Sequence, residues 1–229
     1  MPTLVLQRGH VPRTTGATGT AGEQAMAKAV ASLAKSMTPA GWKCRVIDAD
    51  EPTSAYKGDY FFAIHGDGSS NKAVDGASVG YRTSNGKRLA TAWKKAYKAR
   101  GWRGDWHPDN YTAALARYYG TGKAADAGNP RACIIEVGTM TNPADRKWID
   151  AHHREIAESI WDAVAPGWDK QEEEPVTDDI QVHVSITPAK FAALTAWLKA
   201  NNVYATATKY VNGTPTVVPV NPNPLREGK

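Results

Sequence analysis

Short apolar runs recur along the first 165 residues of this chain, in the pattern typical of buried strands. They lie at Leu4 to Gln7, Cys44 to Asp48, Tyr60 to Ile64 and Cys133 to Val137. These runs predict four strands, which the intervening segments must connect.

Between these runs, apolar residues recur every three or four positions, which predicts helices that each bury one face. The three series are Met26, Val30, Leu33 and Met37; Leu89, Trp93, Ala96 and Tyr97; and Ile149, Ile156, Ile160 and Val164. Asn142-Pro143 predicts the start of the last helix, because proline is favoured in a first helical turn. Strands that alternate with helices predict an α/β fold, in which a twisted, mostly parallel sheet is flanked by helices.

This pattern breaks between Pro166 and Pro175, where two prolines, a glycine and three successive glutamates stand close together. Helix breakers beside an acidic run indicate a linker, so we expect a first domain over residues 1–166 and a linker over residues 167–175. Residues 176–229 predict a small βαββ (α+β) domain. Its expected elements are a strand through Ile180, Val182, Val184 and Ile186, a helix after Thr187-Pro188, and strands over Val203 to Val211 and Thr216 to Val220.

The composition is that of a globular protein, with 229 residues of which 41% are hydrophobic and 22% are charged. These values exclude a disordered or fibrous chain. No run of about 18 apolar residues is present, so we expect no membrane insertion. The N-terminus lacks a charged segment followed by an apolar core, so we expect synthesis in the cytoplasm of the host cell without a signal peptide.

The net charge of +5 is concentrated in the first part of the chain. Residues 1–170 hold 23 of the 28 basic residues but only 17 of the 23 acidic ones. A basic surface suits an anionic polymer, either nucleic acid or a bacterial wall, and charge alone does not choose between them. Both cysteines, Cys44 and Cys133, fall in strand-like runs, where a buried free thiol is the usual occupant.

Three residues have the setting of metal ligands. His10 and His65 each follow a predicted strand, and the carboxyl ends of parallel strands meet at one edge of a sheet. Glu23 lies on the apolar face of the first predicted helix, where a buried carboxylate needs a compensating charge. Two histidines and one carboxylate are a ligand set of catalytic zinc. His152 and His153, on the apolar face of the last helix, are expected to pack there.

Glu136 is a fourth candidate, near the carboxyl end of the apolar run Cys133 to Val137. Zinc lowers the pKa of a bound water molecule to about 7, and a nearby glutamate can take the proton and pass it to a leaving amine. The residues alone therefore predict metal-assisted hydrolysis of an amide, with Glu136 as the catalytic acid and base.

In order and context, these residues resemble the zinc-dependent N-acetylmuramoyl-L-alanine amidases of bacterial autolysins and phage endolysins. The similarity rests on Gly9-His10, Glu23, Ile64-His65 and the segment from Glu136 to Asp145, and it covers roughly residues 1–165. The resemblance implies one Zn²⁺ ion held by His10, Glu23 and His65, with peptidoglycan and not nucleic acid as the partner. The scissile bond would join the lactyl group of N-acetylmuramic acid to L-alanine. A phage endolysin, acting on the wall after release from the cell, is the expected type.

Four further residues are candidate contacts of the substrate. Asp67 follows the second histidine, where the family often has a small residue and Asn, and Asn142 belongs to the matching segment after Glu136. Trp106 and His107 lie in a loop rich in aromatic residues, which would wall a glycan groove by stacking or, equally, pin the loop itself.

Two other functions remain open from the sequence. A zinc carboxypeptidase acting on the stem peptides of peptidoglycan uses a similar ligand set, but such peptidases favour a His-x-x-Glu spacing, whereas His10 and Glu23 stand thirteen positions apart. A non-catalytic wall-binding protein would not need all four site residues. The small C-terminal domain is expected either to bind the cell wall or to form a homodimer.

Overall fold

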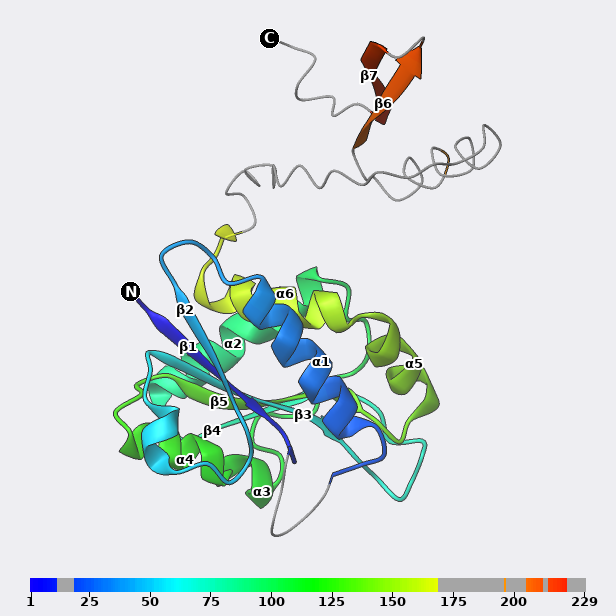
Figure 1. Cartoon of the computed structure of the whole chain (residues 1–229). Coiled ribbons are helices and arrows are strands. Elements are labelled where there is room, and N and C mark those ends of the chain that lie inside the picture. Colours follow the sequence, from blue (N-terminus) through cyan, green and yellow to red (C-terminus); the bar gives the residue numbers. More distant parts are fainter. Residues whose placement is uncertain (12–18, 169–195, 197–204, 212–213, 222–229) are drawn as a thin grey trace. The chain divides into compact units, whose positions relative to one another are not determined.

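The computed structural model describes residues 1–11, 19–168, 196, 205–211 and 214–221 (Figure 1). The chain forms two compact units, Met1–Glu172 and Glu173–Lys229.

The first unit is built around a sheet of five strands in the order β2-β1-β3-β5-β4. The strands are β1 (Thr3–Arg8), β2 (Lys43–Ile47), β3 (Tyr60–Asp67), β4 (Ser78–Tyr81) and β5 (Ala132–Thr139). The pairs β1–β2, β1–β3 and β3–β5 are parallel, and only β4 runs antiparallel, against β5. The expected mostly parallel sheet and its four predicted strands are confirmed. Strand β4 was not predicted, because four residues are too few to show an alternating pattern.

Helices cover both faces of this sheet (Figure 1). They are α1 (Glu23–Ser36), the 3-10 helix η1 (Thr53–Tyr56), α2 (Ser84–Ala99), α3 (Ala113–Ala116), α4 (Tyr119–Asp126), α5 (Pro143–Ala151) and α6 (His153–Val164). On one face α6 packs between α1 and α2, and the fully buried Trp93 and Trp161 belong to that core. On the other face η1, α3 and α4 enclose a smaller core around Tyr56 and Phe61.

The predicted last helix is in fact two helices, which is a correction to the sequence analysis. Asn142 caps α5 as expected, since its side chain accepts hydrogen bonds from the backbone N–H groups of Ala144 and Asp145. The chain then leaves helical geometry at His152, where φ is −129° and ψ is 34°. Nδ1 of His152 lies 2.7 Å from the carbonyl oxygen of Trp148, and the two rings stack at 4.3 Å. The side chain thus binds a carbonyl that a continuous helix would use for its own backbone.

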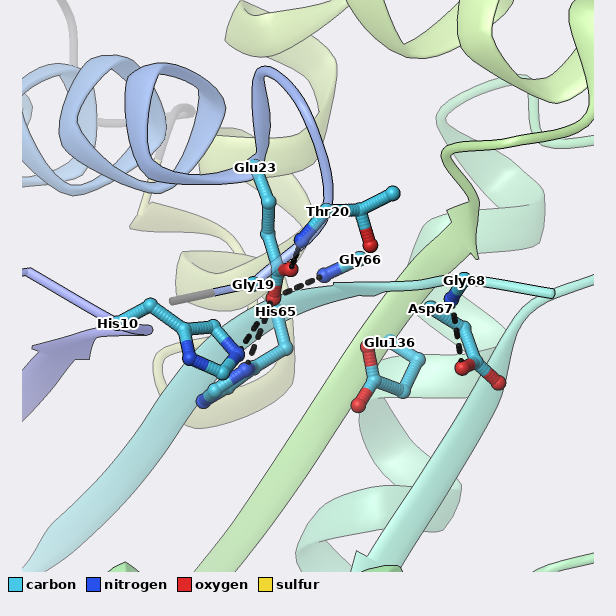
Figure 2. A pocket seen from close by; sticks show the side chains of 9 residues that line it. All are labelled: His10, Gly19, Thr20, Glu23, His65, Gly66, Asp67, Gly68 and Glu136. Carbon is cyan, nitrogen blue, oxygen red and sulfur yellow. Dashed lines mark hydrogen bonds and ion pairs between the residues drawn. The ribbon is translucent and has the colours of Figure 1, made fainter. Parts of the chain in front are cut away.

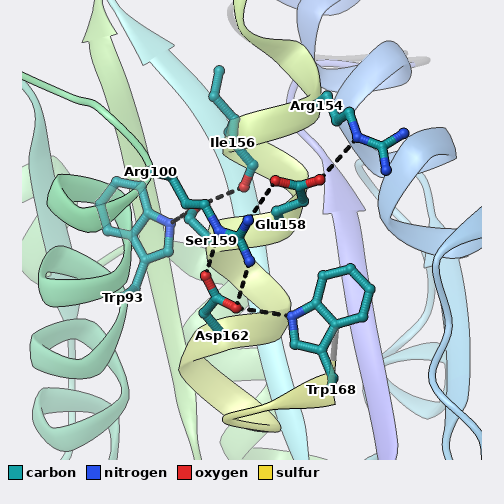
Figure 3. Close-up of polar contacts among 8 residues, drawn as sticks. All are labelled: Trp93, Arg100, Arg154, Ile156, Glu158, Ser159, Asp162 and Trp168. Atoms are coloured by element: carbon teal, nitrogen blue, oxygen red, sulfur yellow. Dashed lines mark hydrogen bonds and ion pairs between the residues drawn. The ribbon is translucent and has the colours of Figure 1, made fainter. Parts of the chain in front are cut away.

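Charged side chains tie α2 to α6 on the surface of the first unit (Figure 3). Arg100 donates to Glu158 at 2.8 Å and to both carboxylate oxygens of Asp162 at 2.6 and 2.9 Å. The indole N–H of Trp168 donates to the same Asp162 at 2.9 Å. The segment that follows α6 is therefore part of the first unit up to Trp168.

Both cysteines are free thiols within strands, as expected. Cys133 is fully buried in β5, whereas Cys44 is half-buried in β2, the strand at the sheet's edge. In the part of the chain that the structure describes, no helix combines the length and apolar character needed to cross a membrane.

The second unit contains an antiparallel pair of strands, β6 (Ala205–Val211) and β7 (Thr214–Asn221). They fall where two strands were predicted. The predicted strand through Ile180 to Ile186, and the helix after Pro188 apart from the helical residue Ala196, lie outside the described residues. The βαββ arrangement, the limits of the linker and the role of this unit stay predictions.

Candidate metal centre

Four candidate site residues, far apart in the sequence, line one pocket of about 440 Å³ (Figure 2). His10 follows β1, Glu23 is the first residue of α1, His65 lies in β3 and Glu136 lies in β5. The parallel strands place their carboxyl ends side by side, as the sequence predicted, and α1 brings Glu23 to the same edge. The remaining lining residues are Gly19, Thr20, Gly66, Asp67 and Gly68.

His10, Glu23 and His65 form a compact cluster. Oε1 of Glu23 lies 3.3 Å from Nε2 of His10 and 3.0 Å from Nδ1 of His65. The donor atoms of the three residues all lie within 4.8 Å of one another. Within the described ranges, no other group of three or more His, Cys, Asp or Glu side chains comes together in this way.

Glu23 is held in place by the backbone as well as by the two imidazoles. Its carboxylate accepts hydrogen bonds from the N–H of Thr20 at 2.8 Å and from the N–H of Gly66 at 3.2 Å. Burial by itself would raise the pKa of Glu23, but the hydrogen bonds from His10 and His65, the charge of His65 and the Thr20 N–H outweigh it. Together they hold the pKa of this carboxyl well below its usual range. The pocket is therefore arranged to keep Glu23 ionised although only 2% of it is exposed.

Two glycines allow the side chains of the cluster to approach the backbone closely. Gly19 has φ of +82°, and a Cβ there would stand 2.6 Å from Oε2 of Glu23 and 2.8 Å from the His10 ring. A Cβ on Gly9 would stand 2.5 Å from the carbonyl oxygen of Ile64 and 2.7 Å from the His65 ring. No other residue fits at these positions without displacing the cluster.

Glu136 shares the pocket but stands apart from the cluster in Figure 2. In the register of the sheet, Glu136 on the middle strand β5 lies beside His65 on β3 and beside Ser78 on β4. Burial raises the pKa of Glu136 well above its usual range, and the negative charges of Glu23 and Asp67 raise it further. Oε2 is buried and has no hydrogen-bond partner among the described residues. A carboxyl whose protonated form is favoured in this way is suited to donate a proton as well as to accept one.

Asp67 and His107, two of the candidate substrate contacts, are linked at the rim of the pocket by Tyr111. The Tyr111 hydroxyl donates to Oδ2 of Asp67, and its ring stacks on His107 with centroids 4.4 Å apart. Burial, the Asp67 hydrogen bond and the charges of Asp67 and Glu136 raise the pKa of Tyr111 above its usual value. Among the described residues, Met1 and Tyr111 are the exposed large hydrophobic ones, and the exposure of Tyr111 suits a contact with substrate.

Trp106 and Asn142 have structural surroundings that account for them without a substrate. Trp106 packs edge-on against Trp93 and Tyr97, outside the residues that line the pocket. Asn142 is 9% exposed, caps α5 and donates from Nδ2 to the carbonyl oxygen of Lys72 at 3.1 Å.

Tyr118 is a residue of the site that the sequence analysis missed. Its hydroxyl lies 2.9 Å from Nε2 of His65, on the side of the ring opposite Glu23. The two residues are 53 positions apart, and no motif or periodicity connects them. Only the fold shows the contact.

Comparison with known protein families shows to which family the chain belongs. Residues 4–166 match the family of N-acetylmuramoyl-L-alanine amidases, which is most of the chain and all of the described site. The chain belongs to this amidase family. The family match supports neither alternative function, the zinc carboxypeptidase or the non-catalytic wall-binding protein.

Solved structures of amidases share the fold of this chain. The catalytic domain of CwlV, an N-acetylmuramoyl-L-alanine amidase from Bacillus (Paenibacillus) polymyxa var. colistinus, is 19% identical with a TM-score of 0.56, covering 74% of this chain and 99% of that one. The amidase Ami1 from Mycobacterium smegmatis is 16% identical with a TM-score of 0.55, covering 74% and 98%.

The catalytic domain of the CD27L endolysin, which targets Clostridia difficile, is 20% identical with a TM-score of 0.53, covering 72% of this chain and 97% of that one. A comparison with curated proteins gave no match. The predicted fold and the predicted function as a peptidoglycan amidase are confirmed.

Proposed function

We propose that this amidase holds one zinc ion with His10, Glu23 and His65, and that Glu136 moves the protons during hydrolysis. The bond cleaved joins the lactyl group of N-acetylmuramic acid to L-alanine. The observation that carries the proposal is the buried carboxylate of Glu23, which faces imidazole nitrogens of two histidines at 3.0 and 3.3 Å.

The donor set fits zinc in both chemistry and spacing. Two imidazole nitrogens and one carboxylate oxygen are a common ligand set for catalytic zinc, which keeps a fourth position open. Zn–N and Zn–O bonds of about 2.0–2.2 Å place neighbouring ligand atoms of a tetrahedral site roughly 3.3–3.6 Å apart. The two distances from Oε1 of Glu23, 3.0 and 3.3 Å, are close to this range. A divalent cation would also balance the charge of a carboxylate that is 2% exposed.

When bound, zinc supplies Lewis-acid activation of water and of the amide carbonyl. Glu136 then has two tasks in sequence. As the carboxylate it accepts a proton from the attacking water, and as the carboxylic acid it donates that proton to the nitrogen of the departing alanine. Burial, which raises the pKa of Glu136, favours its carboxylic acid form and so suits the donating step.

Digestion of purified peptidoglycan, followed by mass spectrometry, tests the proposal. The expected products are stem peptides with a new N-terminal alanine and glycan strands whose muramic acid keeps a free lactyl group. Shortened stem peptides would instead indicate a carboxypeptidase. Metal analysis of the same preparation should give one zinc ion per chain, and a protein that cleaves this bond without metal would contradict the assignment of the three ligands.

We further propose that the enzyme acts as an endolysin, made in the cytoplasm and released to the wall. The fold is compatible with this role, because the catalytic domain of the CD27L endolysin also has it, and a net charge of +5 suits an anionic wall. Cells that express the amidase together with a separate pore-forming protein should lyse, whereas cells that express the amidase alone should not. Lysis by the amidase alone would indicate an exported autolysin.

A further inference from the structure

His65 makes polar contacts through both of its ring nitrogens. Nδ1 faces Glu23 at 3.0 Å, and Nε2 faces the hydroxyl of Tyr118 at 2.9 Å. The Tyr118 ring also packs against the His65 ring almost at a right angle, with centroids 5.2 Å apart. Tyr118 therefore fixes both the plane and the polar environment of this imidazole.

The hydrogen bonds continue from Tyr118 to Gln7, a fully buried residue of β1. The Tyr118 hydroxyl donates to Oε1 of Gln7 at 2.6 Å. Nε2 of Gln7 donates to the hydroxyls of Tyr56 at 2.7 Å and Tyr119 at 3.1 Å. An amide nitrogen only donates and an amide oxygen only accepts, so Oε1 is the atom that receives the proton of Tyr118.

This order of donors determines which nitrogen of His65 carries a proton. A phenol has one proton, and Tyr118 also shares a hydrogen bond with Tyr119, whose hydroxyl can donate to it. We assign the proton of Tyr118 to Oε1 of Gln7, an acceptor only and at 2.6 Å nearer than Nε2 of His65 at 2.9 Å, so its oxygen accepts from the Nε2–H of His65. A neutral imidazole protonated at Nε2 presents a lone pair at Nδ1, which is the nitrogen that faces Glu23. Two electron-rich atoms 3.0 Å apart require a cation between them, either a proton or a metal ion.

The side chain of Arg82 holds the backbone at Tyr118. Nη2 of Arg82 donates to the carbonyl oxygens of Arg117 and Tyr118, and Nε of Arg82 lies 3.2 Å from the hydroxyl of Thr121. Gln7 lies in β1 directly beside Ala63 in β3, two residues before His65. Tyr118 and Gln7 together form a hydrogen-bond relay to His65. The sheet fixes Gln7, and the loop that leads into α4 fixes Tyr118.

We infer that Tyr118 and Gln7 are positioning residues that hold His65 as the Nε2–H tautomer, with unprotonated Nδ1 as its zinc ligand. The inference rests on the zinc site proposed above and adds two residues to it that do not touch the ion. Ligating histidines generally donate their second N–H to a polar partner, and removal of that partner weakens metal binding by about 10–100-fold.

The zinc affinity of Tyr118→Phe tests the first step. This substitution keeps the ring but removes the oxygen that accepts from Nε2, so the zinc Kd, measured by competition with a chelator, should rise about 10–100-fold. Tyr81→Phe is the matched control: it also removes a phenol that donates to a side chain, here Asp109 at 3.2 Å, but Tyr81 does not line the pocket, and the zinc Kd of this variant should stay within about threefold of wild type, below that range. Equal zinc affinities for wild type and Tyr118→Phe would overturn the inference.

The tautomer itself is measured by ¹⁵N NMR of the His65 ring in the zinc-loaded protein. Wild type should show a protonated Nε2 and a metal-bound Nδ1. Gln7→Leu removes the acceptor of the Tyr118 proton, which leaves Tyr118 able to donate to Nε2 and to favour the opposite tautomer. The variant should therefore bind zinc more weakly. In its zinc-free form Nε2 of His65 should lose the proton that it carries in wild type.

These outcomes separate the inference from the proposed zinc site. If wild type binds no zinc at His10, Glu23 and His65, the proposed function fails. If wild type binds zinc but both variants, folded as judged by circular dichroism, keep its affinity and its tautomer, only the relay fails.

Discussion

Nδ1 of His65 and Oε1 of Glu23 lie 3.0 Å apart, although one residue belongs to strand β3 and the other begins helix α1. Both residues are at most 4% exposed. A buried carboxylate beside a histidine is stable only when a cation balances its charge, so this contact couples the fold of the first unit to the proposed zinc site.

Glu136→Gln should abolish hydrolysis while zinc stays bound. Glutamine keeps the shape of the side chain but neither accepts nor donates the catalytic proton, so we expect the rate to fall by roughly 10²–10⁴-fold. Turnover of a soluble muropeptide and the zinc content of the same sample provide the measurement. Asp126→Asn, at an exposed position of α4, serves as the control for a lost carboxylate. Loss of zinc from Glu136→Gln would instead make Glu136 a ligand.

Alanine in place of His10, Glu23 or His65 should lower both zinc occupancy and rate. Each substitution removes one of three protein ligands, and the remaining two hold the ion poorly. His152→Ala is the matched control, because its ring stacks on Trp148 and does not line the pocket. Removal of zinc with a chelator should stop the wild-type reaction, and added zinc should restore it. Full occupancy and rate in any of the three variants would exclude that residue as a ligand.

Glu136→Gln should also stabilise the zinc-free protein at neutral pH. Because the folded-state pKa of Glu136 is raised, its favourable contribution is complete below the ordinary value of 4.5 and is lost as pH rises through the raised pKa. Glutamine carries no such penalty, so the variant should gain roughly 1–3 kcal/mol at pH 7, or several degrees in Tm, and little at pH 4. Thermal unfolding with and without zinc measures the effect. An equal gain at both pH values would show that ionisation of Glu136 is not its cause.

The sequence predicted the core of the site because its chemistry follows the regular part of the fold. His10 and His65 lie at the ends of apolar runs, and parallel strands bring such ends together. Glu23 was found because it shares the apolar face of a helix, where a carboxylate is unexpected. These three inferences need only local periodicity and one rule of sheet topology.

The contacts that the sequence could not predict depend on side chains far apart in the chain. Tyr118 meets His65 and Gln7 across 53 and 111 positions, through a loop with no repeating pattern. The break at His152 depends on a stacked indole and on a side-chain hydrogen bond to a carbonyl, which overrides an apolar pattern that continues through it. Strand β4 forms by pairing with β5, and its own four residues show no strand pattern.

Both cysteines should react slowly with thiol reagents in the folded protein. Burial raises the pKa of Cys44 from 9.0 to about 11, and it raises that of Cys133 well above its usual value. At pH 8 a thiol with a pKa near 11 is about a hundredfold less ionised than an ordinary one, and only the thiolate reacts. Labelling followed in native buffer and in denaturant should show fast reaction of both cysteines only after unfolding. Rapid native labelling of Cys44 would contradict its half-buried position in β2.

A chain that ends at Glu174 should hydrolyse soluble muropeptides as the full chain does but attack intact walls more weakly. The cut keeps Trp168, whose indole N–H donates to Asp162, the residue that also pairs with Arg100 (Figure 3). The first unit should therefore keep its stability, whereas a chain that ends at Ala165 loses this contact and should unfold at a lower temperature.

The weaker attack on walls follows if residues 176–229 bind the wall, since a tethered binding module raises the local concentration of the enzyme. Sedimentation with purified walls, beside analytical ultracentrifugation, distinguishes the two predicted roles of the second unit. Wall binding that survives the cut, together with a change from dimer to monomer, would show that the second unit serves assembly.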